Sequence, residues 1–157
     1  MIEIERKFLV TSDTYKSVAS KKYRIVQGFL NSNSERVVRV RIKEDKGFLT
    51  VKGKSDVSGL SRFEWEIEIP LSDAENLLKI CEKGVIDKIR YEVIIDGKTF
   101  EVDEFLGDNQ GLVIAEIELK NPFETFKRPV WLGEEVTGKT QYYNSNLIIN
   151  PYNKWSI

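Results

Sequence analysis

The chain has 157 residues, which is enough for one domain with a sizeable core, and we expect a single domain spanning residues 1–157. Its 24 Lys and Arg residues balance 25 Asp and Glu residues, so a net charge of −1 gives no basic excess for binding nucleic acid or an anionic membrane. Histidine is absent, which excludes Ser-His-Asp and Cys-His catalysis and any metal site built on imidazole.

Most of the chain alternates β-branched or aromatic residues with polar ones, which is the period-two pattern of strands. In chain order, we expect strands over residues 2–9, 22–30, 36–44, 48–54, 61–69, 85–95, 98–106 and 112–120. Turn-like residues separate them at 45–47, 96–98 and 107–111. The pattern predicts about eight mostly antiparallel strands in a mainly β (α+β) fold.

Two helices are expected between these strands. In residues 71–84, Ser72 and Glu75 form a capping box, an apolar stripe follows, and Gly84 is a natural end. Residues 11–20 give a weaker helical signal, with Ser12 as the expected N-cap. A further short helix is expected near residues 143–147.

The sequence favours a reducing compartment. Its single cysteine, Cys81, cannot form an internal disulfide. No apolar run reaches the roughly 18 residues expected of a membrane-spanning helix. The first ten residues alternate charge instead of forming a signal peptide. We therefore expect a cytoplasmic protein with no membrane or nucleic-acid partner.

Full charges occupy one face of nearly every expected strand. The opening strand places Glu3, Glu5 and Lys7 on one face and Ile2 and Ile4 on the other. The same alternation recurs downstream with Arg39, Arg41, Lys52, Glu64, Glu66, Lys88, Arg90, Glu101, Asp103, Glu116 and Glu118.

Two interpretations of this charged face remain open at this point. An antiparallel sheet commonly exposes one face to water, which alone produces such alternation. Alternatively, the sheet curls so that the charged faces converge on a tunnel. Two features favour the tunnel: the polar positions are almost all full charges, and cations and carboxylates segregate by strand. Periodicity does not determine which way the sheet curls.

A tunnel of this kind would suit a chain of phosphates. Arg offers a planar fork to phosphate oxygens, and Lys offers a point charge. Without histidine, a metal there would be held by carboxylates, which indicates hard ions such as Mg²⁺ or Mn²⁺. Mg²⁺ commonly takes one or two protein carboxylates and completes its shell with phosphate and water.

Over essentially the whole chain, the motifs resemble the CYTH family of triphosphate tunnel metalloenzymes. The most specific is the ExExK signature, formed by Glu3, Glu5 and Lys7 near the start of the chain. Other matches are Arg39-Val40-Arg41, Lys52 in TVKGK, the RxExE strand at 62–66, the KxRY strand at 88–91, Asp103 in EVDEF, Glu116-Ile117-Glu118 and the closing GEEVTGKTQYYNSNL. Lys139 and Gln141 depart from the closing segment, where the family often has an acidic residue and Arg.

The resemblance implies an eight-stranded antiparallel β-barrel that forms an open tunnel with flanking helices, and a requirement for Mg²⁺ or Mn²⁺. The metal carboxylates it implies are Glu3, Glu5, Asp103, Glu116 and Glu118. The implied phosphate-binding residues are Lys7, Arg39, Arg41, Lys52, Lys88 and Arg90. The residues it places closest to catalysis are Lys7, Glu64, Glu66 and Lys88.

The implied activity is hydrolysis of inorganic tripolyphosphate to pyrophosphate and phosphate, as in the short bacterial members of the family. Two alternatives use the same kind of tunnel, namely class IV adenylate cyclase and thiamine triphosphatase. A third is a non-catalytic polyphosphate-binding module. The intact carboxylate set argues against the last, because anion capture alone would gain nothing from so many acids.

If the charges fill the interior, the apolar faces of the strands point outward. Two short helices are too few to cover them all, and soluble monomers rarely expose large apolar patches. We therefore expect a homodimer, with Phe29, Trp131 or Trp155 as contributors to the interface.

Overall fold

A computed structural model describes residues 1–156 of the chain. Within them, the strands are β1 (Ile2–Val10), β2 (Lys21–Asn31), β3 (Arg36–Lys43), β4 (Lys46–Gly53), β5 (Ser61–Ile69), β6 (Ile86–Ile95), β7 (Lys98–Phe105), β8 (Val113–Glu118) and β9 (Leu132–Glu135). The α-helices are α1 (Tyr15–Val18), α2 (Leu71–Leu78) and α3 (Asn144–Leu147), and the 3₁₀ turns are η1 (Gly107–Asn109), η2 (Thr140–Tyr142) and η3 (Tyr152–Lys154).

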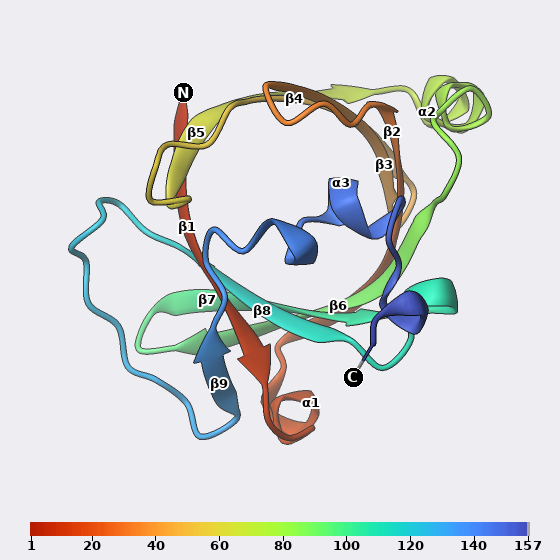
Figure 1. Cartoon of the computed structure of the whole chain (residues 1–157). Helices are drawn as coiled ribbons and strands as arrows, with labels where there is room; N and C mark the ends of the chain where they lie inside the picture. The colour runs from red at the N-terminus through yellow and green to blue at the C-terminus, as the bar shows by residue number, and fades with distance from the viewer. Residues whose placement is uncertain (157) are drawn as a thin grey trace.

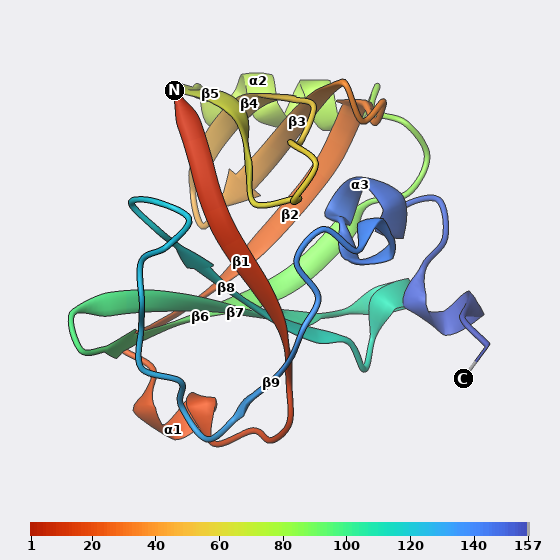
Figure 2. The same ribbon diagram turned by 60° about the vertical axis from the view of Figure 1, so that its left-hand side comes forward.

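Strands β1 to β8 close into an antiparallel barrel (Figures 1 and 2). Around the ring they lie in the order β5-β4-β3-β2-β6-β7-β8-β1. β1 closes it by pairing with β8 through Lys7 and Glu116 and with β5 through Glu3 and Arg62. β9 pairs with β1 outside this ring. The predicted eight-stranded antiparallel barrel is confirmed.

One hydrophobic core covers the outer face of the barrel on the side of β1, β6, β7 and β8. Phe8, Tyr91, Val93 and Phe100 are buried there against Trp131 of the segment that follows β8. On the opposite side, α2 packs against β3 and β4. A Cβ at Gly47 would lie 2.6 Å from the Ala74 methyl group, so only glycine permits the close approach of β4 to α2.

A second core lies where the C-terminal tail, residues 136–156, meets the end of the barrel. Leu147 of α3 is fully buried and packs with Phe29, Ile86, Phe105 and Ile114. In Figure 1, which looks along the barrel, α3 lies inside the ring of strands. The tail therefore crosses one end of the bore, which the sequence did not predict.

Several local expectations are wrong in detail. The chain enters α2 at Pro70, so Ser72 already lies in the first turn, and no side-chain cap is formed among the described residues. The helix ends at Leu78, well before Gly84. Thr14 precedes α1 in place of Ser12, likewise with no side-chain cap in the described part of the chain. The hairpin between β3 and β4 turns at residues 44–45 rather than 45–47.

Two of the three expected interface residues lie inside the protomer. Phe29 is 2% exposed and Trp131 is 3% exposed, because each packs in one of the two cores. The expectation that they contribute to a dimer interface is therefore wrong. Trp155 is partly buried beside the second core. Within residues 1–156, no helix is long and apolar enough to cross a membrane.

Candidate active site

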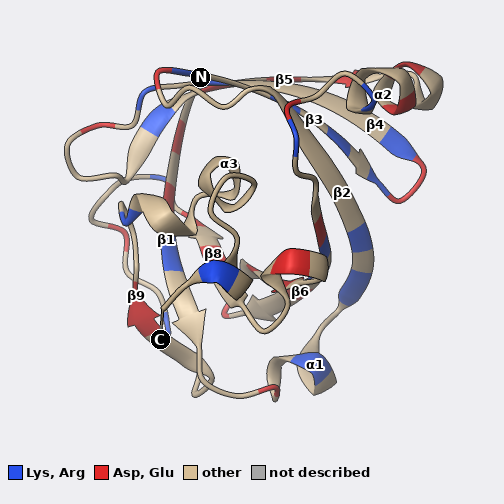
Figure 3. Ribbon diagram, turned by 45° about the vertical axis from the view of Figure 1, so that its right-hand side comes forward, with Lys and Arg blue, Asp and Glu red and all other residues tan. Residues whose placement is uncertain are grey.

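Inside the barrel lies a cavity of about 450 Å³ whose walls carry charges of both signs. Figure 3 shows both acidic and basic positions on the strands of the ring. The cavity brings together Glu3, Glu5, Lys7, Arg39, Arg41, Lys52, Glu64, Glu66, Lys88, Arg90, Glu116 and Glu118 from the predicted set, with Arg62 and Glu101 in addition. The charged face of the strands thus lines the interior, as the tunnel interpretation predicts.

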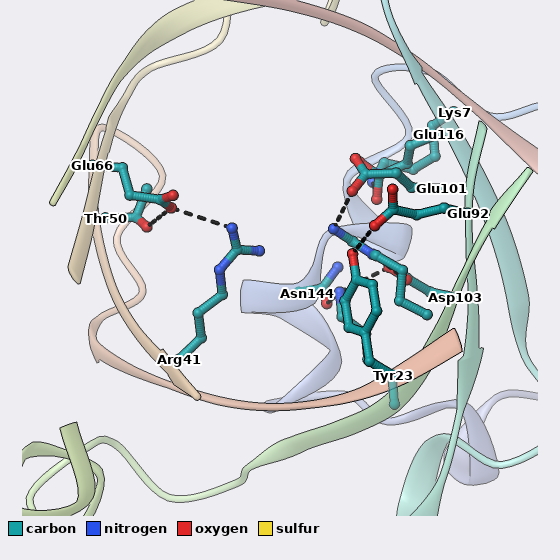
Figure 4. A network of polar contacts seen from close by, with 12 residues as sticks. Lys7, Tyr23, Arg41, Thr50, Glu66, Glu92, Glu101, Asp103, Glu116 and Asn144 are labelled. Carbon is teal, nitrogen blue, oxygen red and sulfur yellow. Dashed lines mark hydrogen bonds and ion pairs between the residues drawn. The ribbon is translucent and has the colours of Figure 1, made fainter. Parts of the chain in front are cut away.

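One wall carries two arginines that share a single carboxylate. Figure 4 shows Arg41 of this group beside Glu66 and Thr50. The Nη2 atoms of Arg39 and Arg41 each lie 3.3 Å from Glu66 Oε2. Thr50 on β4 also donates a 2.5 Å hydrogen bond to this oxygen, which fixes the position of Glu66. Burial and the neighbouring Arg41 charge lower the pKa of Arg39 to about 10. Positive charge is therefore in excess at this wall.

The opposite wall is fully paired. Arg90 forms a bidentate pair with Asp103 at 2.7 and 2.8 Å and donates a 2.7 Å hydrogen bond to Glu101. Lys88 Nζ lies 2.8 Å from Asp103 Oδ2. Burial lowers the pKa of Lys88 to about 8, although the charge of Asp103 opposes the shift.

Asp103, one of the expected metal ligands, is not among the residues that line the cavity in the described part of the chain. Its side chain is 1% exposed, and both oxygens are engaged by Arg90 and Lys88 beneath the cavity wall. A carboxylate that is paired twice in this way orients the two cations above it.

The other carboxylates of the cavity lie close to lysines and to one another. Lys52 Nζ lies 3.0 Å from Glu3 Oε2, and Lys7 Nζ lies 3.0 Å from Glu116 Oε1. The carboxyl group of Glu5 is in hydrogen-bonding contact with that of Glu116. The same relationship holds between Glu3 and Glu64.

These contacts and burial shift the pKa values of the acids in opposite directions. Burial and the Glu116 charge raise the pKa of Glu5 well above its usual range. Burial would also raise the pKa of Glu116, but the charge of Lys7 and the hydrogen bond to Glu5 hold it well below. Burial raises the pKa of Glu64 to about 7, in spite of the neighbouring Lys52 charge.

The donor chemistry of these pairs fits a hard divalent cation. Carboxylate oxygens are ligands that hard cations such as Mg²⁺ and Mn²⁺ prefer. Among residues 1–156, no group of three or more acidic, His or Cys side chains is arranged as a complete metal cage. That suits an ion that keeps only one or two protein carboxylates and takes its other ligands from phosphate and water.

The C-terminal tail supplies a part of the cavity that sequence reasoning missed. Thr137, Gly138, Tyr143, Asn144 and Ser145 all line it. The Tyr143 ring lies between two cations, with its centroid 6.0 Å from Lys7 Nζ and 5.6 Å from the Arg62 guanidinium carbon. Only the match of the closing segment to the family motif pointed to this region.

The two residues that depart from the motif lie away from the cavity. Lys139 forms an ion pair of 2.7 Å with Glu134, and both side chains are exposed. Gln141 is exposed as well. Neither residue is among those that line the cavity in the described part of the chain.

The CYTH domain profile matches residues 1–148. The chain belongs to the CYTH family. An inorganic triphosphatase from Acetivibrio thermocellus is 54% identical over 151 residues, which cover 96% of this chain and 95% of that relative. An inorganic triphosphatase from Nitrosomonas europaea is 34% identical over 154 residues, covering 96% of this chain and 99% of the relative.

A solved crystal structure of an inorganic triphosphatase shares this CYTH barrel. Its TM-score is 0.65 at 31% sequence identity, and the match covers 94% of each chain. A structure from Pyrococcus horikoshii, 23% identical with a TM-score of 0.61 over 76% of this chain and 80% of that one, shares the fold. The barrel thus follows the CYTH fold over nearly the whole chain.

Proposed function

We propose that the protein hydrolyses inorganic tripolyphosphate to pyrophosphate and phosphate in the barrel cavity and depends on Mg²⁺ or Mn²⁺. The observation that carries the proposal is the arginine wall, where Arg39 and Arg41 share the single carboxylate of Glu66. The Nε atoms of Arg39 and Arg41 are buried and have no hydrogen-bond partner within residues 1–156. Buried donors without partners are costly, and phosphate oxygens would satisfy them. The names of the two relatives support the same activity.

Six cations would hold the phosphate chain. Arg39 and Arg41 would take one end, because their positive charge is only partly neutralised by Glu66. Lys88 and Arg90 would contact the chain from the opposite wall, held in place by Asp103. Lys7 and Lys52 would bind between them, next to the carboxylate pairs.

One or two of the carboxylates Glu3, Glu5, Glu116 and Glu118 would hold the divalent ion, with phosphate oxygens and water completing its shell. When bound, such an ion neutralises phosphate charge and lowers the pKa of a coordinated water. Asp103 is assigned to orienting Lys88 and Arg90, since both of its oxygens are already paired.

The side chains of the cavity would then position an in-line attack at a terminal phosphorus. Glu66 holds the two arginines, and Lys7, Arg90 and Lys88 stabilise charge on the phosphoryl oxygens. The Glu64 carboxylate would accept the proton of the attacking water, because a pKa of about 7 suits a general base near neutral pH.

A direct test is phosphate release from tripolyphosphate, ATP, thiamine triphosphate and pyrophosphate, each with Mg²⁺ or Mn²⁺. Preferential release from tripolyphosphate is expected. Binding of all four compounds without turnover would contradict an enzymatic role and favour a polyphosphate-binding module.

A further inference from the structure

The C-terminal tail places one amide, that of Asn144, where three elements meet. Its Oδ1 accepts a 3.0 Å hydrogen bond from Lys88 Nζ on β6 and a 2.9 Å hydrogen bond from Gln27 Nε2 on β2. In the view of Figure 4, Asn144 lies between Arg41 and Asp103. The roles proposed above for the charged strands do not use this amide.

The two contacts determine which way the Asn144 amide faces. An ammonium group and an amide NH₂ group are both donors only, so the atom that meets them must be the carbonyl oxygen. The Nδ2 group is then turned away from Lys88 and Gln27, in a side chain that lines the cavity. Its two N–H groups are donors of the kind that phosphoryl oxygens accept.

Gln27 holds the Asn144 amide in this orientation through its hydrogen bond to Oδ1. Its side chain is 0% exposed, and its Oε1 has no hydrogen-bond partner in the described part of the chain. A buried oxygen without a partner is costly. Turning the amide over would direct Oε1 at Asn144 Oδ1 and lose the hydrogen bond that Gln27 donates to the tail. The hydrogen bond therefore holds the two amides in one mutual orientation.

Asp103 and Asn144 hold the Lys88 ammonium group from two sides. An ammonium group has three N–H donors. Asp103 Oδ2 at 2.8 Å and Asn144 Oδ1 at 3.0 Å account for two of them. The third donor remains for a ligand in the cavity, which Lys88 also lines.

We propose that Asn144 is a positioning and substrate-binding residue through which the tail takes part in the reaction: its Oδ1 aims the Lys88 ammonium at the phosphate chain, and its Nδ2 donates to a phosphoryl oxygen. Gln27 is the positioning residue that holds Asn144 in this orientation. The inference deepens the proposed function and rests on it.

Three substitutions test the contributions of the Oδ1 and Nδ2 atoms of Asn144. Asn144→Asp keeps an oxygen toward Lys88 but removes the Nδ2 donor and adds a charge that repels phosphate, so kcat/KM should fall at least about a hundredfold. Asn144→Ala removes both contacts and should cost at least about tenfold. Gln27→Leu leaves the Asn144 amide in place but frees its orientation, and we expect a several-fold loss confined mainly to kcat.

Two further variants distinguish this role from a merely structural one. Leu147→Ala loosens the packing of the tail without altering the Asn144 amide. Asn153→Ala removes an exposed amide from the same tail and should leave activity unchanged. The inference predicts that Asn144→Asp, with little change in Tm, loses far more activity than Leu147→Ala, which lowers Tm. Equal activity loss at equal Tm loss would overturn it.

The deciding experiment combines tripolyphosphate hydrolysis with calorimetric binding of tripolyphosphate in EDTA, using the full chain and these variants. Binding to Asn144→Asp should weaken at least tenfold, while Asn153→Ala matches the parent. Unchanged binding and turnover in Asn144→Asp would overturn the inference and leave the proposed function intact. If the parent binds tripolyphosphate but does not hydrolyse it, the proposed function fails and the binding comparison still decides the role of Asn144. A parent that neither binds nor hydrolyses would overturn both.

Discussion

The carboxyl groups of Glu5 and Glu116 meet in hydrogen-bonding contact inside the barrel, where both side chains are buried. Burial and the Glu116 charge raise the pKa of Glu5 well above its usual range, which favours a proton on Glu5. Taking up a divalent cation would displace that proton and relieve the repulsion between the two carboxylates.

Removal of divalent ions should therefore abolish activity. We expect no phosphate release from tripolyphosphate in EDTA and full recovery with excess Mg²⁺ or Mn²⁺. Mg²⁺ should also raise the Tm of the protein, because an ion bound only by the folded state stabilises it. Glu5→Gln should lose this Tm shift. Undiminished turnover in the chelator would exclude the metal role of Glu5 and Glu116.

Replacing Arg39 or Arg41 by Ala should lower kcat/KM at least tenfold, about 1.4 kcal/mol. The reason is that phosphate charge would be left unpaired in a confined cavity. The fold should persist and even gain stability, since two buried guanidinium groups share one carboxylate. Arg36→Ala is the matched control, because Arg36 is an exposed residue of the same strand. Steady-state kinetics and thermal unfolding measure both effects.

The alternating strand pattern predicted most of the fold and most of the residues that line the cavity. Alternation of Glu3, Glu5 and Lys7 with Ile2 and Ile4 fixes which side chains share a face, because register along a strand is a local property. Which face of the sheet turns inward is not a local property. It depends on the closure of β1 against both β5 and β8, which only the family resemblance indicated.

The tail was missed for the same physical reason. Its position inside the barrel depends on Leu147 packing against residues from four strands, contacts that no local pattern encodes. Asn144 lies in the closing segment that matches the family motif, although no charged periodicity singled it out, and nothing in the sequence pattern marked Gln27. Asp103 was correctly placed among the inward charges, but its pairing with Lys88 and Arg90 requires the three-dimensional neighbours.

Asp56 should stabilise the loop between β4 and β5 in a pH-dependent way. Hydrogen bonds from Ser58 and Ser61 lower the pKa of Asp56 to about 2 from a usual value of 3.8. A carboxyl group with a lowered folded pKa stabilises the protein above pH 3.8, and the stabilisation is lost as the pH falls toward 2.

Asp56→Ala should accordingly lower the free energy of unfolding by a constant amount between pH 5 and pH 8, and the difference from the parent should shrink below pH 4. Denaturant unfolding at several pH values measures it. Asp45→Ala, in the exposed turn between β3 and β4, is the control and should show a smaller effect. A difference that grows as the pH falls would contradict the assignment.

The homodimer remains a prediction, and the exposed face of β5 is its best candidate surface. Phe63, Trp65 and Ile67 are 44–47% exposed in a row on the outside of the barrel, where α2 does not cover them. Light scattering at micromolar concentration should give twice the protomer mass. Trp65→Glu should give the protomer mass, whereas Val130→Glu, at an exposed apolar residue elsewhere, should not. A protomer mass for the parent would count against a dimer.

The central claim is that the cavity selects a free chain of three phosphates, and the ratio of kcat/KM for tripolyphosphate to that for ATP tests it most directly. Cations on both walls can engage the two free ends of tripolyphosphate, whereas ATP must leave its nucleoside at the cavity mouth. Only contacts that strengthen in the transition state raise the rate. We predict a ratio on the order of a hundredfold, about 2.7 kcal/mol, with pyrophosphate turned over poorly. Equal or faster turnover of ATP, above all with cyclic AMP as the product, would contradict the account.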